Sequence, residues 1–246
     1  MTQAQTQISA NSSRLVRSLA ELVGTGAAVS HKHFTERLGQ LFDLPDSIRL
    51  SAVHERAPAA AFAPPATSRE AAKEEFLRAR ASIVSSALGR FTPGGGSLRL
   101  RFPVATADMT PEEIVAPEPY LAFYAAQQRD IDFRIRNLQA ATRDAIAVFS
   151  PGLARLAALD AALADPLAAP ARRLFAAVPR LLQRRFGILL EDYRREIGDR
   201  VHSPDRWDKT IGQFRDEMRA LLLAEIETRL LPALGLIEAL DEHQGE

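Results

Sequence analysis

An apolar seam between Tyr120 and Phe149 constrains the fold of this chain more than any other pattern in it. Its positions follow one another at steps of three or four residues: Leu121, Tyr124, Gln128, Ile131, Ile135, Leu138, Thr142, Ile146 and Phe149. Because an α-helix turns once every ~3.6 residues, these steps place the side chains on one face. The spacing is similar to a coiled-coil seam and predicts one long helix over 120–149.

Helical patterns recur on both sides of this seam. The apolar spacing and the helix-capping residues predict further helices over 68–88, 170–201 and 205–231, with a short terminal helix that begins at Pro232. The residues Thr110 to Glu113 form a capping box, which predicts a helix start there. We therefore predict an all-α protein, a multi-helix bundle with a small N-terminal helical subdomain and a long central helix.

Proline and glycine divide the chain into predicted domains. A small helical bundle is expected over 12–56, a Pro/Ala linker over 57–68 and a larger helical bundle over 69–246. An irregular arm interrupts the larger bundle at 92–119, where prolines and three consecutive glycines break any helix. Within this arm Leu98, Leu100 and Phe102 alternate with arginines, which favours an extended segment.

The composition limits where such a protein works. The chain has no cysteine and no net charge, so disulfides, thiolate metal sites and general attraction to polyanions are not expected. No uncharged run approaches the ~18 apolar residues of a membrane helix, and the N-terminus lacks the pattern of a signal peptide. We expect a cytoplasmic protein without membrane insertion.

No catalytic or metal-binding pattern is present. His31 and His33 lie two residues apart, so on a helix their rings would point away from each other. Asp205, Asp208 and Lys209 resemble a nuclease set, but they lie within one predicted helix start, where Asp205 favours the positive end of the helix. We predict that the protein is not an enzyme, and we expect no metal, no cofactor and no small-molecule ligand.

Arginines gather on one predicted helix. Between residues 171 and 190 there are five arginines and no acidic residue. The candidates for binding nucleic acid or an acidic partner are Arg172, Arg173, Arg180 and Arg184. Arg173, Arg180 and Arg184 fall on one face, opposite apolar residues such as Leu174 and Val178. Arg185 falls inside the apolar arc, so either it is partly buried or the helix is kinked near Pro179 or Gly187.

Two interpretations of these arginines remain open. They contact nucleic-acid phosphates or an acidic partner. Alternatively they form a solvated face that the C-terminal segment 205–246 partly neutralises, because this segment carries an excess of acidic residues.

Four stretches of sequence resemble a known family. They are FTERLGQLFDLPDSIRLSA at 34–52, FLRARASIVSSAL at 76–88, LARLAALDAAL at 153–163 and LFAAVPRLLQRRFGILL at 174–190. The family is proteobacterial, uncharacterised and defined only as a domain of unknown function. The resemblance implies a gene beside a proton-channel pair similar to flagellar motor stators, including a Zorya-type anti-phage (antiviral) defence variant.

The resemblance implies a role but no catalytic residues. The expected protein is a non-enzymatic cytosolic accessory or effector of such a defence system that binds nucleic acid or a partner protein. Its expected partners are the stator-like membrane proton-channel proteins or a co-encoded accessory protein. The alternative is a helical structural adaptor that docks to the motor complex or self-associates, without binding nucleic acid. The 120–149 seam supports self-association only if it is exposed rather than part of the core.

Overall fold

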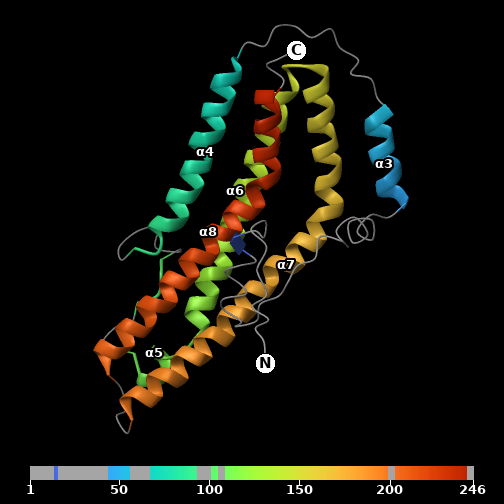
Figure 1. The fold of residues 1–246 in the computed structure, drawn as a ribbon. Coiled ribbons are helices and arrows are strands. Elements are labelled where there is room, and N and C mark those ends of the chain that lie inside the picture. The colour runs from blue at the N-terminus through green and yellow to red at the C-terminus, as the bar shows by residue number, and fades with distance from the viewer. Residues whose placement is uncertain are drawn as a thin grey trace, which may run out of the picture. The chain divides into compact units, whose positions relative to one another are not determined.

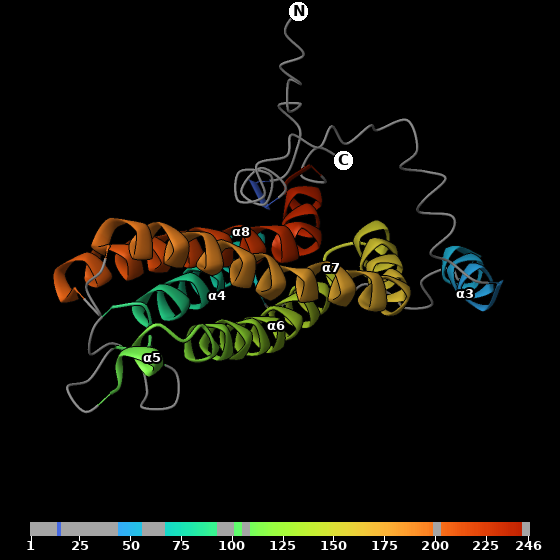
Figure 2. The ribbon, with the colours of Figure 1, turned by 90° about the horizontal axis from the view of Figure 1, so that it is seen from below.

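The computed structural model describes residues 14–15, 44–55, 67–92, 101–104, 109–198 and 203–242. Figures 1 and 2 show its helices in two views: α3 Leu44–Glu55, α4 Arg69–Gly89, α5 Pro111–Ile114, α6 Glu118–Ala147, α7 Pro151–Ile197 and α8 Pro204–Glu242. The described ranges contain no strand, so the predicted all-α fold with a long central helix is confirmed. Most of the predicted N-terminal bundle lies outside the described residues, together with His31 and His33.

The helices contribute to two compact units. The first unit contains the described residues 14–15, 84–92, 101–104, 109–131, 176–198 and 203–228. The second contains 44–55, 67–83, 132–175 and 229–242. Most of the predicted linker over 57–68 falls outside the described residues, so the predicted division into domains stays a prediction.

The apolar seam of α6 forms part of the core in each unit. In the first unit Ile131 exposes 1% of its surface, and in the second Ile135 exposes 2%. Tyr124 and Ile146 are likewise buried. Burying a side chain of this size contributes about 1.5–3 kcal/mol, so the seam stabilises both units. It is the core of the protein and not a docking surface.

The short helix α5 begins with the capping box that its sequence predicts. The backbone N–H of Thr110 donates to Oε2 of Glu113 at 2.8 Å, and the N–H of Glu113 donates to Oγ1 of Thr110 at 3.3 Å. These bonds satisfy donors that a helix start leaves without partners. The backbone hydrogen bond from Thr110, followed by the hydroxyl contact, lowers the pKa of Glu113 from its ordinary value.

Part of the predicted arm is packed against the first unit. Residues 101–104 are neither helix nor strand, yet the ring of Phe102 is buried. Its N–H donates to the carbonyl of Arg90 at 3.2 Å. Its ring lies 5.5 Å from that of Phe123 and 5.4 Å from that of Tyr120. The glycine run Gly94–Gly96 and the alternating Leu98 and Leu100 lie outside the described residues.

Helices α7 and α8 are longer than the helices that we predicted from the positions of prolines in the sequence. We expected a helix over 170–201 and a new short helix at Pro232. Instead α7 runs from Pro151 through Pro166, Pro170 and Pro179 to Ile197, and α8 continues through Pro232. Those predicted boundaries are wrong.

Packing explains why Pro179 and Pro232 do not end their helices, but it does not apply to Pro166 and Pro170, which lie in a stretch of α7 without buried residues. A proline inside a helix costs about 3 kcal/mol, because it lacks an N–H and crowds the preceding turn. The turns that flank Pro179 carry Val178 and Leu182, both fully buried. The turns that flank Pro232 carry Leu230 and Ala233, also fully buried. The free energy of burying these neighbours offsets the local cost.

Candidate functional site

The four arginines that the sequence singles out, called here the α7 arginines, are all exposed. Arg172 and Arg173 belong to the second unit, and Arg180 and Arg184 belong to the first. With respect to the described residues, none of the four side chains forms a hydrogen bond or an ion pair. Their guanidinium groups therefore have donors available for an anion from outside.

The apolar face of α7 is partly as predicted. Val178, Leu182 and Leu189 are buried in the first unit. Leu174, which belongs to the second unit, differs from them and exposes 50% of its surface. It ends a stretch of α7, residues 158–174, in which no residue is buried.

The acidic residues of α8 that form ion pairs do so with other bases. Glu217 accepts two hydrogen bonds from Arg185, at 2.7 and 2.9 Å. The other pairs join Glu227 to Arg14, Asp241 to Lys73 and Asp216 to Arg215. Among the described residues, this segment therefore does not neutralise the α7 arginines by direct pairing.

Arg185 differs from its exposed neighbours on α7. Its side chain exposes only 23% of its surface, which confirms the predicted partial burial. The hydrogen bond to Glu217 raises the pKa of Arg185, although burial works in the opposite direction. This residue holds α7 and α8 together within the first unit and is not a candidate for binding an outside partner.

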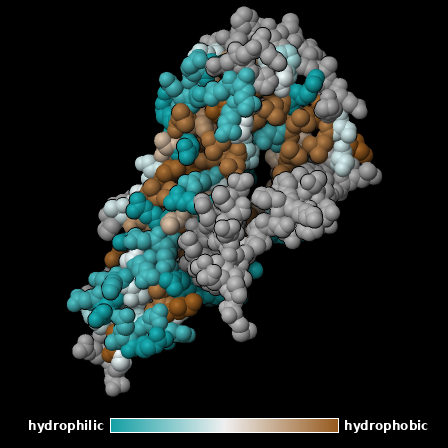
Figure 3. All heavy atoms as spheres, in the orientation of Figure 1, coloured by the Kyte–Doolittle hydropathy of each residue, from teal (hydrophilic) through white to brown (hydrophobic). Residues whose placement is uncertain are grey.

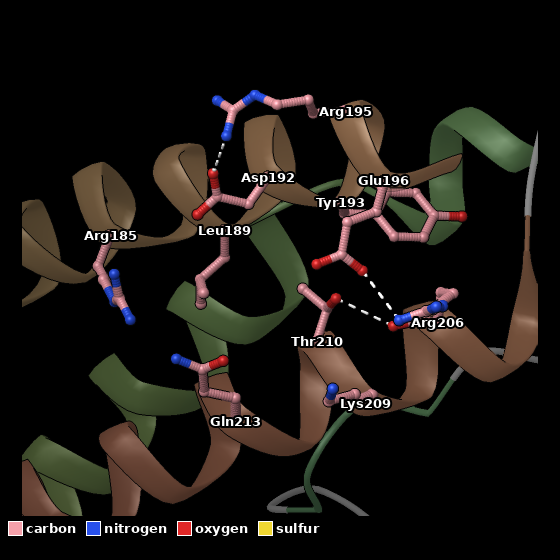
Figure 4. Close-up of a pocket in the computed structure, with 10 residues that line it drawn as sticks. All are labelled: Arg185, Leu189, Asp192, Tyr193, Arg195, Glu196, Arg206, Lys209, Thr210 and Gln213. Carbon is pink, nitrogen blue, oxygen red and sulfur yellow. Dashed lines mark hydrogen bonds and ion pairs between the residues drawn. The ribbon is translucent and has the colours of Figure 1, made fainter. Parts of the chain in front are cut away.

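A polar groove of about 310 Å³ lies between α7 and α8 in the first unit (Figure 4). From α7 it is lined by Arg185, Leu189, Asp192, Tyr193, Arg195 and Glu196, and from α8 by Arg206, Lys209, Thr210 and Gln213. In each helix these positions recur about one turn apart, so each set belongs to one side of its helix. Sequence reasoning missed this groove, although the polar residues at this spacing were a signal that could have indicated it.

Aromatic residues fix the two helices beneath the groove. The ring of Tyr193 on α7 lies 5.1 Å from that of Trp207 on α8. The ring of Phe186 lies 5.2 Å from that of Phe214, in an edge-to-face arrangement. Tyr193 also accepts a hydrogen bond at its hydroxyl from the N–H of Ser203, at 2.9 Å. Such contacts stabilise an aromatic pair by ~0.5–1.5 kcal/mol beyond burial alone, so the walls of the groove are held in place.

A second, smaller hollow of about 170 Å³ lies elsewhere in the first unit. Phe102, Tyr120 and Trp207 line it, with Asp208 also in its wall. Burial, with a smaller contribution from Asp208, raises the pKa of Tyr120 to about 12. The phenol therefore stays protonated at neutral pH, which does not suit a general base.

An ionisable residue lies in the core of the first unit. Glu225 of α8 has no exposed surface. Its carboxylate accepts a hydrogen bond from the hydroxyl of Tyr124 at 2.6 Å and hydrogen bonds from Nε2 of Gln128 at 2.9 and 3.0 Å. Buried polar groups are stable when their partners are present, so this cluster fixes how α6 and α8 pack.

Two further observations concern metals and membranes. In the described ranges, no group of three or more His, Asp or Glu residues is placed to hold a metal ion. No helix there is long and apolar enough to cross a membrane. Asp205 lies in the first turn of α8, as its sequence predicts.

Comparison with known proteins identifies a family. A protein-family model described as "Protein of unknown function (DUF3348)" matches residues 1–242. No curated protein and no solved structure matches the chain.

Proposed function

The chain belongs to the DUF3348 family of proteins of unknown function, and on this premise we propose that it is a non-enzymatic accessory component of a bacterial anti-phage defence system of the Zorya type. It works in the cytoplasm and acts by binding nucleic acid. Its protein partners are the stator-like membrane proton-channel proteins encoded beside it. The sequence resemblance supports the defence context, and the α7 arginines support the mode of action.

One observation supports nucleic-acid binding above the others. The α7 arginines are exposed and have no partner among the described residues, although acidic residues of α8 form ion pairs elsewhere. Arginine binds phosphate with two parallel hydrogen bonds, which suits a nucleic-acid backbone. In the described parts of α7 and α8 every aromatic side chain is buried, so none is available to stack on a base next to the α7 arginines. We therefore expect binding to the phosphate backbone, without sequence preference.

Charge reversal tests this proposal one unit at a time. We expect R180E/R184E, in the first unit, to weaken binding to a double-stranded DNA fragment at least about tenfold at low salt, because two phosphate contacts become repulsive. R172E/R173E should act similarly in the second unit. Fluorescence anisotropy measures the affinity, and circular dichroism checks that the helices remain.

The matched control is R129E/R219E. Arg129 and Arg219 are exposed arginines in the first unit that also lack partners among the described residues. This variant changes the net charge by the same amount as R180E/R184E. Equal losses in the two variants would show that only total charge matters, and no loss in either α7 variant would contradict the proposal.

A different observation supports a structural adaptor instead. In the second unit, residues 158–174 of α7 are mostly apolar and none of them is buried. Leu159, Leu163 and Leu167 follow one another at steps of four residues, which places them on one face. Figure 3 shows apolar residues gathered on the visible face over the first half of α7 and the second half of α8. Such a surface is typical of a protein contact.

The adaptor alternative makes its own prediction. If α7 docks to a stator-like partner, we expect the single change L174D to abolish co-purification with that partner, because Leu174 is half exposed and a buried carboxylate opposes docking. Binding to DNA should fall less in L174D than in R172E/R173E, because L174D adds one negative charge and keeps both guanidinium groups. Unaltered co-purification would exclude this face of α7, and loss of DNA binding instead would favour a shared surface.

A further inference from the structure

The polar groove between α7 and α8 is bracketed by ion pairs that join the two helices. At one end Arg185 pairs with Glu217 at 2.7 Å, and at the other Glu196 pairs with Arg206 at 3.2 Å. As α7 advances from Arg185 to Glu196, the paired residue on α8 moves back from Glu217 to Arg206. The two helices therefore run in opposite directions. Apolar side chains usually close such a seam. Here about 310 Å³ remains open between the two pairs.

The groove offers more hydrogen-bond donors to a ligand than acceptors. Its lining includes four basic residues and two acidic ones. Both acidic residues already accept from an arginine, Asp192 from Arg195 at 2.8 Å and Glu196 from Arg206 at 3.2 Å. Lys209 has no hydrogen bond or ion pair with any described residue. Its ammonium group is therefore left to bind an anion.

Neutral donors stand beside this ammonium group. Thr210 and Gln213 extend from α8 into the groove, close to Lys209 and Arg206 (Figure 4). The hydroxyl of Thr210 donates to the carbonyl of Arg206 at 3.0 Å, so it donates to a phosphate only after rotating away from that carbonyl. The side-chain amide of Gln213 donates one hydrogen to Glu217 at 3.0 Å and keeps a second one for a ligand. Arg206, Lys209, Thr210 and Gln213 are spaced to share one face of α8, so they can converge on one group.

We propose that this groove binds the terminal phosphate of a small phosphorylated ligand, such as a di- or triphosphate. Lys209 and Arg206 provide the positive charge, and Thr210 and Gln213 provide neutral hydrogen bonds. The pair of Arg206 with Glu196 is more than half exposed on both sides, and exposed pairs exchange partners at little cost. A volume of about 310 Å³ lies at the lower end of the range for ligand pockets.

This site is separate from the proposed nucleic-acid surface. It uses none of the α7 arginines, and all of its residues lie within the first unit. It also departs from the sequence expectation that the protein has no small-molecule ligand. The phosphate can come from a free nucleotide or from the 5′ end of a nucleic-acid strand, and the chemistry of recognition is the same for both.

Binding of pyrophosphate by the full chain tests the proposal. Isothermal titration at low salt should show one site per chain in the parent protein. We expect the variant R206Q/K209Q to bind at least tenfold more weakly, because it loses both charges that face the phosphate. R129Q/R219Q changes the net charge by the same amount at two exposed arginines outside the groove and should bind like the parent. A parent that does not bind pyrophosphate, or an unchanged R206Q/K209Q, would overturn the proposal.

Two further probes identify the source of the phosphate. Tighter binding of ATP than of pyrophosphate, lost in R206Q/K209Q, supports the groove as a nucleotide site. A 5′-phosphorylated oligonucleotide that binds more tightly than its 5′-hydroxyl form, with the difference lost in R206Q/K209Q, supports a strand end. If neither difference depends on Arg206 and Lys209, the groove does not recognise a terminal phosphate. Because R206Q/K209Q leaves the α7 arginines unchanged, loss of pyrophosphate binding in this variant is a separate outcome from loss of DNA binding in R180E/R184E, so failure here is distinct from failure of the proposed function.

Discussion

Replacing Glu225 by alanine is expected to destabilise the protein by about 3 kcal/mol. The carboxylate is fully buried and accepts hydrogen bonds from Tyr124 and Gln128. Its removal takes the acceptor of these hydrogen bonds out of the core, at a cost of ~1–3 kcal/mol per bond, and adds a cavity. Chemical denaturation followed by circular dichroism measures the free energy of unfolding.

Two variants place this effect in context. E225Q keeps the shape of the side chain but turns an acceptor into a donor, so we expect an intermediate loss of stability. E238A removes an exposed carboxylate from the same helix and should change the free energy of unfolding by less than about 0.5 kcal/mol. Equal stability of E225A and E238A would contradict the role given to the buried cluster.

Replacing Phe214 by alanine is expected to cost about 3–5 kcal/mol. Its ring has no exposed surface and contacts Phe186 at 5.2 Å and Tyr120 at 6.1 Å, both edge to face. The substitution therefore removes buried area and two ring contacts, and it leaves a cavity between α6, α7 and α8. The midpoint of denaturation should fall sharply, because the first unit has its aromatic core there.

The matched control uses the same residue type at an exposed position. Phe133 exposes 61% of its surface, so F133A should change the free energy of unfolding by less than about 1 kcal/mol. A loss in F214A no greater than that in F133A would contradict the packing of the first unit. The comparison removes the effect of helix propensity, because both changes replace phenylalanine by alanine within a helix.

Local and periodic signals predict much of this fold. The α6 seam and the Thr110–Glu113 capping box depend on neighbouring residues or on helical steps, so both are found where the sequence places them. The extents of α7 and α8 were not predictable in this way. Whether Pro179 ends a helix depends on how firmly Val178 and Leu182 are buried by residues distant in the chain.

The candidate surfaces were predictable to different degrees. A run without acidic residues is visible in sequence, and the structure leaves Arg172, Arg173, Arg180 and Arg184 exposed. Acidic residues of α8 form ion pairs with Arg14, Lys73 and Arg185. These pairs are tertiary contacts, so no local sequence pattern predicts them. The polar face of each helix is visible in sequence at helical steps, but the groove itself is not, because it forms only where the faces of two separate helices meet.

The salt dependence of DNA binding tests most directly whether the α7 arginines bind phosphates. Each neutralised phosphate contributes about −0.9 to the slope of log K against log salt concentration. We predict a slope of about −1.8 if one arginine pair binds and about −3.6 if both bind, and a slope less steep by about 1.8 in R180E/R184E. Absence of binding at low salt, or a slope that R180E/R184E leaves unchanged, would contradict nucleic-acid binding by these residues.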